Sequence, residues 1–243
     1  MGAEKLKIEN GELKMKEPVT CNFSMAEVFR FLEELRENNN REWFNAHKEW
    51  YLAVKARHED FINQVIPALA VTEPDMDGLT AKDCIFRIYR DIRFSPNKEP
   101  YKTHIGAYMV KGGKQSPRAG YYVHIEPGNC MIGGGIWCPE PSLLKVLRKD
   151  VYDNIDEFTG ILRDAKFQKY YVLEGEKLKK VPAPFPADFP EGDLLKYKSY
   201  TVSNYVPDSF FEGEDVVERC VERLLLMQPF NRFLNYTVEE TWR

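Results

Sequence analysis

Hydrophobic residues in the first third of the chain recur at the spacing of helices. Ser24 and Glu27 have the spacing of a capping box, whose side chains bind free amide groups at a helix start, so a helix is expected from there to about Glu37. Three asparagines at positions 38–40 end it. From Arg41 an apolar stripe at intervals of three and four predicts one long helix that packs on another element. The stripe consists of Trp43, His47, Tyr51, Val54, His58, Phe61, Val65 and Leu69.

In the middle of the chain the pattern changes to strict alternation of polar and apolar residues. This period of two predicts strands of an antiparallel sheet. The four predicted strands cover residues 84–94, 104–111, 120–126 and 131–137. Residues suited to turns separate them, because proline fixes φ and glycine allows positive φ. These links are Ser95-Pro96-Asn97, Gly112-Gly113 and Pro127-Gly128-Asn129.

The last hundred residues return mainly to helical spacing. Leucines and valines over 143–162 predict a helical hairpin, and 217–225 predicts a final helix that Pro229 interrupts or ends. Four prolines over 181–190 impose an extended loop, interpreted as packed on the protein, with a proline ligand for a partner as the alternative. Residues 197–206 alternate and can add a fifth strand. The order predicts an α+β fold: an antiparallel meander sheet of four to five strands packed against N-terminal and C-terminal helices.

Composition indicates a globular protein with one large core. The chain has 243 residues, of which 43% are hydrophobic and 13% aromatic. We expect a single α+β domain over 22–243, preceded by a flexible segment over 1–21. No apolar run suggests a secretory signal or a membrane span, so no membrane association and a cytoplasmic location are expected. The five cysteines are too few and too scattered for a disulfide framework, and we expect buried free thiols.

Positive charge is concentrated in one segment of an otherwise acidic protein. Between Cys84 and Arg118 eight residues are basic and two are acidic, whereas the whole chain has a formal net charge of −4. A positive patch on an acidic protein indicates a surface that faces anions. The segment also carries tyrosines and phenylalanines between its arginines and lysines.

Strand parity suggests which side chains share a face. If 84–94 and 120–126 are strands, each has an apolar face and a polar face, and an antiparallel sheet aligns the polar faces. The predicted ligand-binding residues are Arg87, Tyr89, Arg93, Lys98, Lys102, His104 and Tyr122. The candidates for proton transfer are Asp91, His124 and Glu126, whose side chains can exchange protons. The alternative is a solvated sheet surface with no ligand.

Arg90 falls on the apolar face of the first predicted strand. An unpaired guanidinium costs several kcal/mol there, so a carboxylate partner is expected, and helical candidates are Glu42, Glu49 and Glu59.

No local signature identifies a reaction. The chain lacks the motifs of phosphate-binding loops, serine hydrolases and zinc proteases. His104 and His124 with Asp91 or Glu126 form an alternative set of metal ligands on adjacent strands, but no short-range ligand spacing supports it, and no metal site is predicted. The triplet Gly133-Gly134-Gly135 marks a place where a ligand or a covering backbone approaches closely.

Several motifs together resemble a known family. They are the residues Asn39-Asn40-Arg41-Glu42-Trp43-Phe44 and the segments FRIYRDIRFSPNKEPYKTHIG, YYVHIEPG and GGGIWCPEP. In this order they resemble the domain-of-unknown-function family 2461, a set of conserved hypothetical proteins, over roughly residues 22–235. The resemblance implies one domain over this length and implies no activity, substrate or catalytic residue.

The favoured function is the binding of a small anionic ligand, phosphate- or carboxylate-bearing, over a basic and aromatic sheet face. Single-stranded nucleic-acid binding is the first alternative, since aromatic side chains stack bases, although the net acidity of the chain disfavours it. A protein-interaction module without catalysis is the second. The pattern leaves the reaction, the cofactor and the oligomeric state undetermined.

Overall fold

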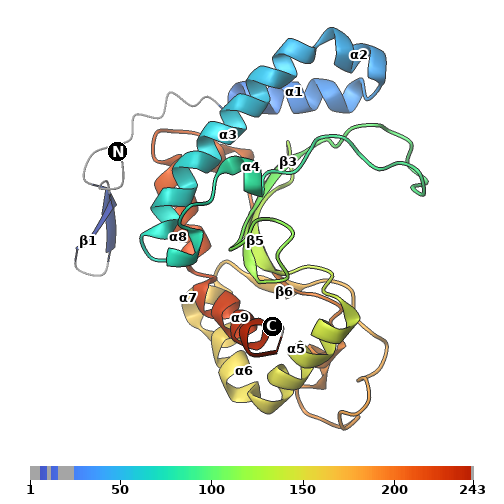
Figure 1. The fold of residues 1–243 in the computed structure, drawn as a ribbon, viewed down its shortest axis with the longest axis vertical. Coiled ribbons are helices and arrows are strands. Elements are labelled where there is room, and N and C mark those ends of the chain that lie inside the picture. The colour runs from blue at the N-terminus through green and yellow to red at the C-terminus, as the bar shows by residue number, and fades with distance from the viewer. Residues whose placement is uncertain (1–5, 10–11, 16–24, 242–243) are drawn as a thin grey trace. The chain divides into compact units, whose positions relative to one another are not determined.

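A computed structural model describes residues 6–9, 12–15 and 25–241 (Figure 1). Contacts between residues group the chain into two compact units. The first comprises Met1–Lys114, Tyr122–Ile132 and Tyr205–Arg223, and the second comprises Gln115–Tyr121, Gly133–Asn204 and Leu224–Arg243. The prediction of a single domain over 22–243 stays a prediction, and the expected flexible segment over 1–21 falls largely outside the described residues. Within the described part of that segment, β1 (Leu6–Glu9) pairs antiparallel with β2 (Glu12–Met15).

The helices of the first unit begin with α1 (Ala26–Glu37), which packs against α3 (Lys48–Ala70). The predicted cap residue Ser24 lies outside the described residues. The long helix predicted from Arg41 is in fact two helices, α2 (Arg41–Ala46) and α3, separated at His47. At this break Nδ1 of His47 lies 2.8 Å from the Trp43 carbonyl oxygen, so the side chain binds a carbonyl of the preceding turn.

The first unit also contains several shorter elements. They are the 3₁₀ turn Pro74–Met76, α4 (Ala81–Cys84), the 3₁₀ turn Asp208–Phe211 and most of α8 (Val216–Leu225). Along α3 the buried side chains include Val54, His58, Phe61 and Val65, as the stripe predicts. The apolar face of α3 therefore faces the interior along most of its length.

One five-stranded sheet has the order β3-β4-β5-β7-β6, and the predicted α+β fold with an antiparallel sheet is confirmed. Three of the four predicted meander strands correspond to β3 (Ile105–Met109), β4 (Gly120–Ile125) and β5 (Cys130–Ile136). The predicted fifth strand is β7 (Tyr200–Val206), and it pairs antiparallel with a strand that the pattern did not predict, β6 (Val172–Glu174).

The prediction of a regular strand over 84–94 is wrong. Residues 85–104 instead form an irregular antiparallel excursion before β3, which we call the arm. It is held by bridges between Ile85 and Ala107 and between Tyr89 and Tyr101, and by a hydrogen bond from the Arg90 amide to the Pro100 carbonyl of 2.9 Å. Prolines have no amide donor and side chains bind the backbone near the tip, so a continuous ladder cannot form there.

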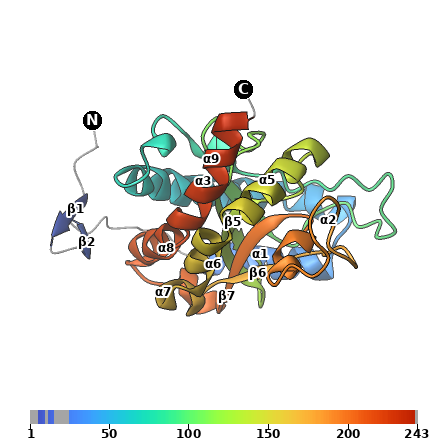
Figure 2. The same cartoon turned by 90° about the horizontal axis from the view of Figure 1, so that it is seen from below.

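The second unit contains α5 (Pro141–Asp153), α6 (Ile155–Arg163), α7 (Ala165–Gln168) and α9 (Gln228–Thr241), with a 3₁₀ turn over Gly192–Lys196. Figure 2 shows α5, α6 and α9 side by side, and their residues are in contact. The predicted helical hairpin is therefore confirmed as α5 and α6. As predicted, the helix before Pro229 ends, and α9 begins one residue ahead of it.

The proline-rich loop packs on α5, in agreement with the favoured interpretation. Rings of Phe185 and Phe189 lie 5.2 and 4.8 Å from the ring of Tyr152. Three described cysteines are buried free thiols, whereas Cys138 is exposed and Cys21 lies outside the described residues. None of the described helices combines the length and apolar character needed to cross a membrane.

The glycine triplet of β5 serves close packing of the backbone. A Cβ at Gly134 would lie 2.5 Å from the Gly120 carbonyl oxygen, and one at Gly135 would lie 2.1 Å from the Tyr200 carbonyl oxygen. Gly135 also has a φ of 102°, which side-chain-bearing residues rarely adopt. Of the two alternatives, a covering backbone therefore accounts for these glycines.

Candidate functional site

Alternate residues of β4 and the residue that directly follows it carry a chain of hydrogen bonds on the polar face of the strand. Nδ1 of His124 lies 2.9 Å from the Tyr122 hydroxyl, and Nε2 of His124 lies 3.2 Å from Oε2 of Glu126. The intervening Tyr121 and Val123 are buried. This is the division into two faces that strand parity predicts for residues 120–126.

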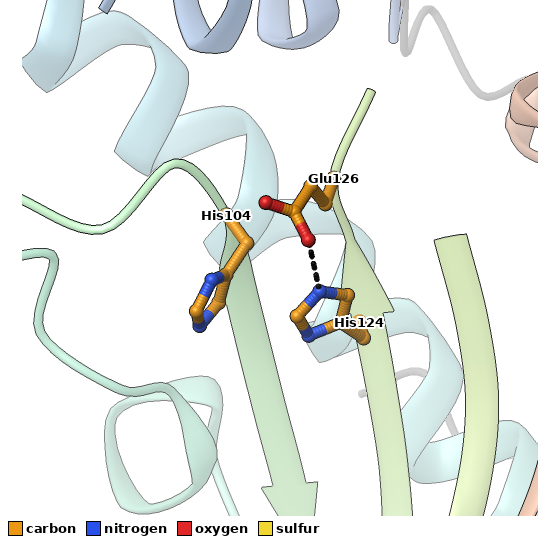
Figure 3. A group of neighbouring side chains, drawn as sticks. All are labelled: His104, His124 and Glu126. Carbon is orange, nitrogen blue, oxygen red and sulfur yellow. Dashed lines mark hydrogen bonds and ion pairs between the residues drawn. The ribbon is translucent and has the colours of Figure 1, made fainter. Parts of the chain in front are cut away.

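The last residues of the arm, just before β3, lie beside these side chains and add to the group. The Thr103 hydroxyl donates a hydrogen bond of 2.7 Å to Oε1 of Glu126, and the His104 ring lies 4.4 Å from the His124 ring. In Figure 3 the side chains of His104, His124 and Glu126 lie beside one another on these two neighbouring segments. We call Thr103, His104, Tyr122, His124 and Glu126 the histidine cluster.

Burial and hydrogen bonding give the cluster defined protonation states. Burial alone would raise the pKa of Glu126, but hydrogen bonds from Asn129, Thr103 and His124 lower it to about 2. Burial and the neighbouring His124 lower the pKa of His104 to about 4, and burial raises the pKa of Tyr122 to about 12. At neutral pH Glu126 is therefore ionised, His104 is uncharged and Tyr122 keeps its hydroxyl proton.

A second feature of the first unit is a pocket between α2 and the arm, with a volume of about 340 Å³. We call it the arm pocket. It is lined by Arg41, Asn45, Tyr89, Arg90, Ile92, Pro100 and Tyr101. Two guanidinium groups and two phenol rings thus surround a space of the size that small-molecule sites have.

The aromatic wall of the arm pocket is held from behind by helix residues. The Phe44 ring stacks on the Tyr101 ring at 3.9 Å, and Tyr89 lies 5.5 Å from Tyr101. Lys48 donates a hydrogen bond of 3.0 Å to the Tyr89 hydroxyl. Asn39 binds both the amide and the carbonyl of Tyr101, each at 3.1 Å, and so fastens the arm to the segment before α2.

Of the two arginines of the arm pocket, one has a carboxylate partner in the described residues and the other has none. Arg90 pairs with Glu99 of the arm across 3.5 Å, so the expected carboxylate partner exists, but it is none of the helical candidates Glu42, Glu49 and Glu59. Arg41 makes no ion pair with any residue in the described part of the chain. The pocket therefore retains positive charge that a bound anion can neutralise.

The structure separates the predicted site residues into four groups. His104, Tyr122, His124 and Glu126 meet in the histidine cluster, and Tyr89 lines the arm pocket. Lys102 directly precedes Thr103 of the cluster and is partly buried, with Nζ 5.4 Å from the Phe86 ring. Burial, and to a smaller extent the charge of exposed Arg87, lower the pKa of Lys102. The expected convergence fails for the remaining residues, Asp91, Arg93 and Lys98, because their contacts lie within the arm.

At the tip of the arm these residues bind one another or the backbone. Arg93 forms a bidentate pair with Asp91, and hydrogen bonds from Arg93 lower the pKa of Asp91 to about 2. The ammonium group of Lys98 donates to the Ile92 carbonyl at 3.0 Å. Parity cannot bring these side chains to the sheet face, since the segment is not a regular strand.

Sequence reasoning missed Arg41, Asn45 and Asn39 as site residues. Asn39 and Arg41 belong to the motif Asn39–Phe44 and Asn45 directly follows it, and this motif lies far from the basic segment in sequence. The structure brings this motif to the arm at Tyr101, so two of the four family-like motifs form one pocket.

Together these features define an α+β protein with a histidine and carboxylate cluster and a basic, aromatic pocket in one compact unit. A family model described as conserved hypothetical protein (DUF2461) matches residues 27–233. The chain therefore belongs to this family, as the resemblance of its motifs predicts. No curated protein and no solved structure matches the chain.

Proposed function

We propose that the protein binds a small anionic ligand, phosphate- or carboxylate-bearing, in the arm pocket. The observation that carries the proposal is the pair of arginines, Arg41 and Arg90, that line a pocket of about 340 Å³ which has no carboxylate residue among its lining residues, Glu99 pairing only with Arg90 across 3.5 Å. Guanidinium groups bind phosphate and carboxylate oxygens through paired hydrogen bonds. The anionic group of the ligand lies against these two residues.

The walls of the pocket favour a ligand with an apolar or aromatic portion. Tyr89, Tyr101, Ile92 and Pro100 offer flat or apolar surface beside the arginines. Tyr101 is held in place by Asn39 and Phe44, so little conformational entropy is lost when the ring of a ligand stacks on this wall. An aryl phosphate or aryl carboxylate therefore fits this pocket better than the free inorganic ion.

Titration calorimetry with inorganic phosphate, phenyl phosphate and phenol tests this function. Phenyl phosphate should bind most tightly, because it has both the charge and the ring, and phenol should not bind measurably. Arg41→Gln and Arg90→Gln should each weaken binding by about 10-fold or more, the loss expected for one charged hydrogen bond. Arg93→Gln, an arginine of the arm outside the pocket, is the matched control and should leave binding unchanged.

Absence of phosphate and phenyl phosphate binding to the folded wild-type protein would refute the proposal. Equal loss in Arg93→Gln and Arg41→Gln would also refute it, since that result indicates general charge attraction rather than a pocket.

Single-stranded nucleic acid is the second candidate ligand, favoured by one side chain of the arm. Phe94 is 94% exposed, and the Arg93 guanidinium lies 6.0 Å from its ring. Exposed rings beside cations stack unpaired bases and contact phosphates. Fluorescence anisotropy with a labelled oligothymidine at low salt tests it: binding that Phe94→Ala removes would support this candidate, and no binding would exclude it.

A further inference from the structure

We propose that His104, His124 and Glu126 bind one divalent transition-metal ion. Their potential ligand atoms all lie within 4.8 Å of one another, and theirs is the one group of three or more such residues found among the described residues. Two imidazoles and one carboxylate are the protein ligands of many zinc hydrolases and non-haem iron(II) enzymes. This site is separate from the arm pocket, so the two proposals can fail independently.

The neighbours of the three residues are those that metal ligands require. A ligating carboxylate is normally hydrogen-bonded, and Glu126 accepts hydrogen bonds from Thr103 at 2.7 Å and from Asn129 at 2.9 Å. The ring nitrogen of a ligating histidine that does not bind the metal normally makes a hydrogen bond, and Nδ1 of His124 lies 2.9 Å from the Tyr122 hydroxyl. In the absence of a metal ion Nε2 carries the proton that Glu126 accepts; when the proton is on Nδ1 and is donated to the Tyr122 hydroxyl instead, Nε2 is free to coordinate on the side of Glu126.

His104 distinguishes a metal site from a purely structural hydrogen-bonded chain. Tyr122, His124 and Glu126 are hydrogen-bonded to one another, whereas His104 makes no hydrogen bond to any described residue although its ring lies beside the other two ligands (Figure 3). A structural chain has no need of this fourth side chain. A metal ion between the three side chains gives the His104 nitrogen a partner.

Three protein ligands leave coordination positions open, as in catalytic rather than structural metal sites. Glu126 supplies one negative charge against a dication, so the loaded site remains positive. Lys102, two residues before His104 on the same segment, adds a further positive charge. An open position in this surrounding is therefore suited to water or to an anionic group of a substrate.

Calorimetric titration of the chelator-treated full chain with Zn²⁺ and with Co²⁺ tests the site. We expect one ion per chain, and His104→Gln and Glu126→Gln should weaken binding by more than about 100-fold, the upper end of what loss of an outer hydrogen-bonding partner costs. Thr103→Val removes such a partner and should weaken binding by about 10-fold or more. Thermal melts of each variant check that it is folded.

His47→Gln and Cys138→Ser are the matched controls, because they remove a histidine and an exposed thiol outside the cluster. Both should bind Zn²⁺ as the wild type does. Loss of binding in either control with retention in His104→Gln would overturn the proposal. No binding of Zn²⁺ or Co²⁺ to the folded wild type would also overturn it, since sites with these ligands bind Zn²⁺ more tightly than Fe²⁺ or Mn²⁺.

Discussion

Glu126 is the residue on which the histidine cluster depends, because it accepts hydrogen bonds from Thr103, from Asn129 and from His124. These donors come from the arm, from the turn after β4 and from β4 itself. The carboxylate therefore stays ionised and fixed in orientation. Its low pKa is the expected result of hydrogen bonds to the charged form outweighing burial.

Gly106 is required because the Tyr122 ring crosses its backbone. A Cβ added there would lie 2.7 Å from the Tyr122 hydroxyl oxygen and 3.0 Å from its nearest ring carbon. Gly106→Ala should displace Tyr122, break its hydrogen bond to His124 and lower the free energy of unfolding by about 1–3 kcal/mol. Denaturant unfolding measures this loss.

The matched control for this substitution is Gly160→Ala at an exposed position of helix α6, where an added Cβ meets nothing within 4 Å. It should raise the free energy of unfolding by up to about 1 kcal/mol, because alanine favours helices over glycine. Equal effects of the two substitutions would contradict the close approach of Tyr122 to Gly106.

Buried His58 makes the stability of the protein depend on pH. Burial, and then Lys55, lower its pKa to about 4 from an ordinary value of 6.5. Because the folded pKa is the lower one, protonation favours the unfolded chain, so stability falls as the pH drops from about 6.5 to 4. The loss attributable to His58 should reach about 3 kcal/mol.

His58→Leu tests this assignment, since leucine cannot be protonated. The difference in free energy of unfolding between wild type and His58→Leu should shift by about this amount between pH 7 and pH 4. His47→Gln is the control. Parallel pH profiles for wild type and His58→Leu would contradict the assignment.

At the scale of elements, the arm is the part that most needs explanation. It has a basic and aromatic sequence with alternating apolar residues, and it is nevertheless not a strand. Asn39 fastens it near its base through two hydrogen bonds to the backbone of Tyr101. Residues near the tip, such as Asp91 and Asn97, bind their own local backbone.

Asn39→Ala should release the arm from the segment before α2. The loss of two hydrogen bonds should lower the free energy of unfolding by about 1–3 kcal/mol and speed hydrogen exchange at the Tyr101 amide. Asn97→Ala, which removes contacts only at the exposed tip, should change stability by less than about 0.5 kcal/mol. Unchanged exchange at Tyr101 in Asn39→Ala would contradict the role of this contact.

Sequence periodicity predicted the regular elements and failed where side chains replace backbone pairing. The alternation over 120–126 gave both the strand and the face that carries His124 and Glu126. The same alternation over 84–94 predicted a strand that does not form. A period of two shows which side chains share a face, but it does not show whether a neighbouring backbone can hydrogen-bond along the whole segment. The break at His47 was invisible because the apolar stripe continues across it.

At the scale of the whole molecule, the concentration of positive charge pointed to the segment that forms part of the arm pocket, but several of its charged residues are not among those that line this pocket. Arg93 pairs with Asp91 and Lys98 binds a backbone carbonyl of the arm, whereas Arg41, which lines the pocket, comes from a helix outside the basic segment. Long-range pairing of this kind has no local signal in one sequence. Both stretches are among the family motifs, but only the structure shows that they lie next to each other.

The most direct test of the central proposal is diffraction from crystals grown with selenate, a heavier analogue of sulfate, recorded at the selenium absorption edge. The proposed function predicts an anomalous peak in the arm pocket within hydrogen-bonding distance of the Arg41 and Arg90 side chains, and no such peak in an Arg41→Gln/Arg90→Gln variant. An empty pocket in crystals that hold selenate at other arginines, or an unchanged peak in the double variant, would contradict it.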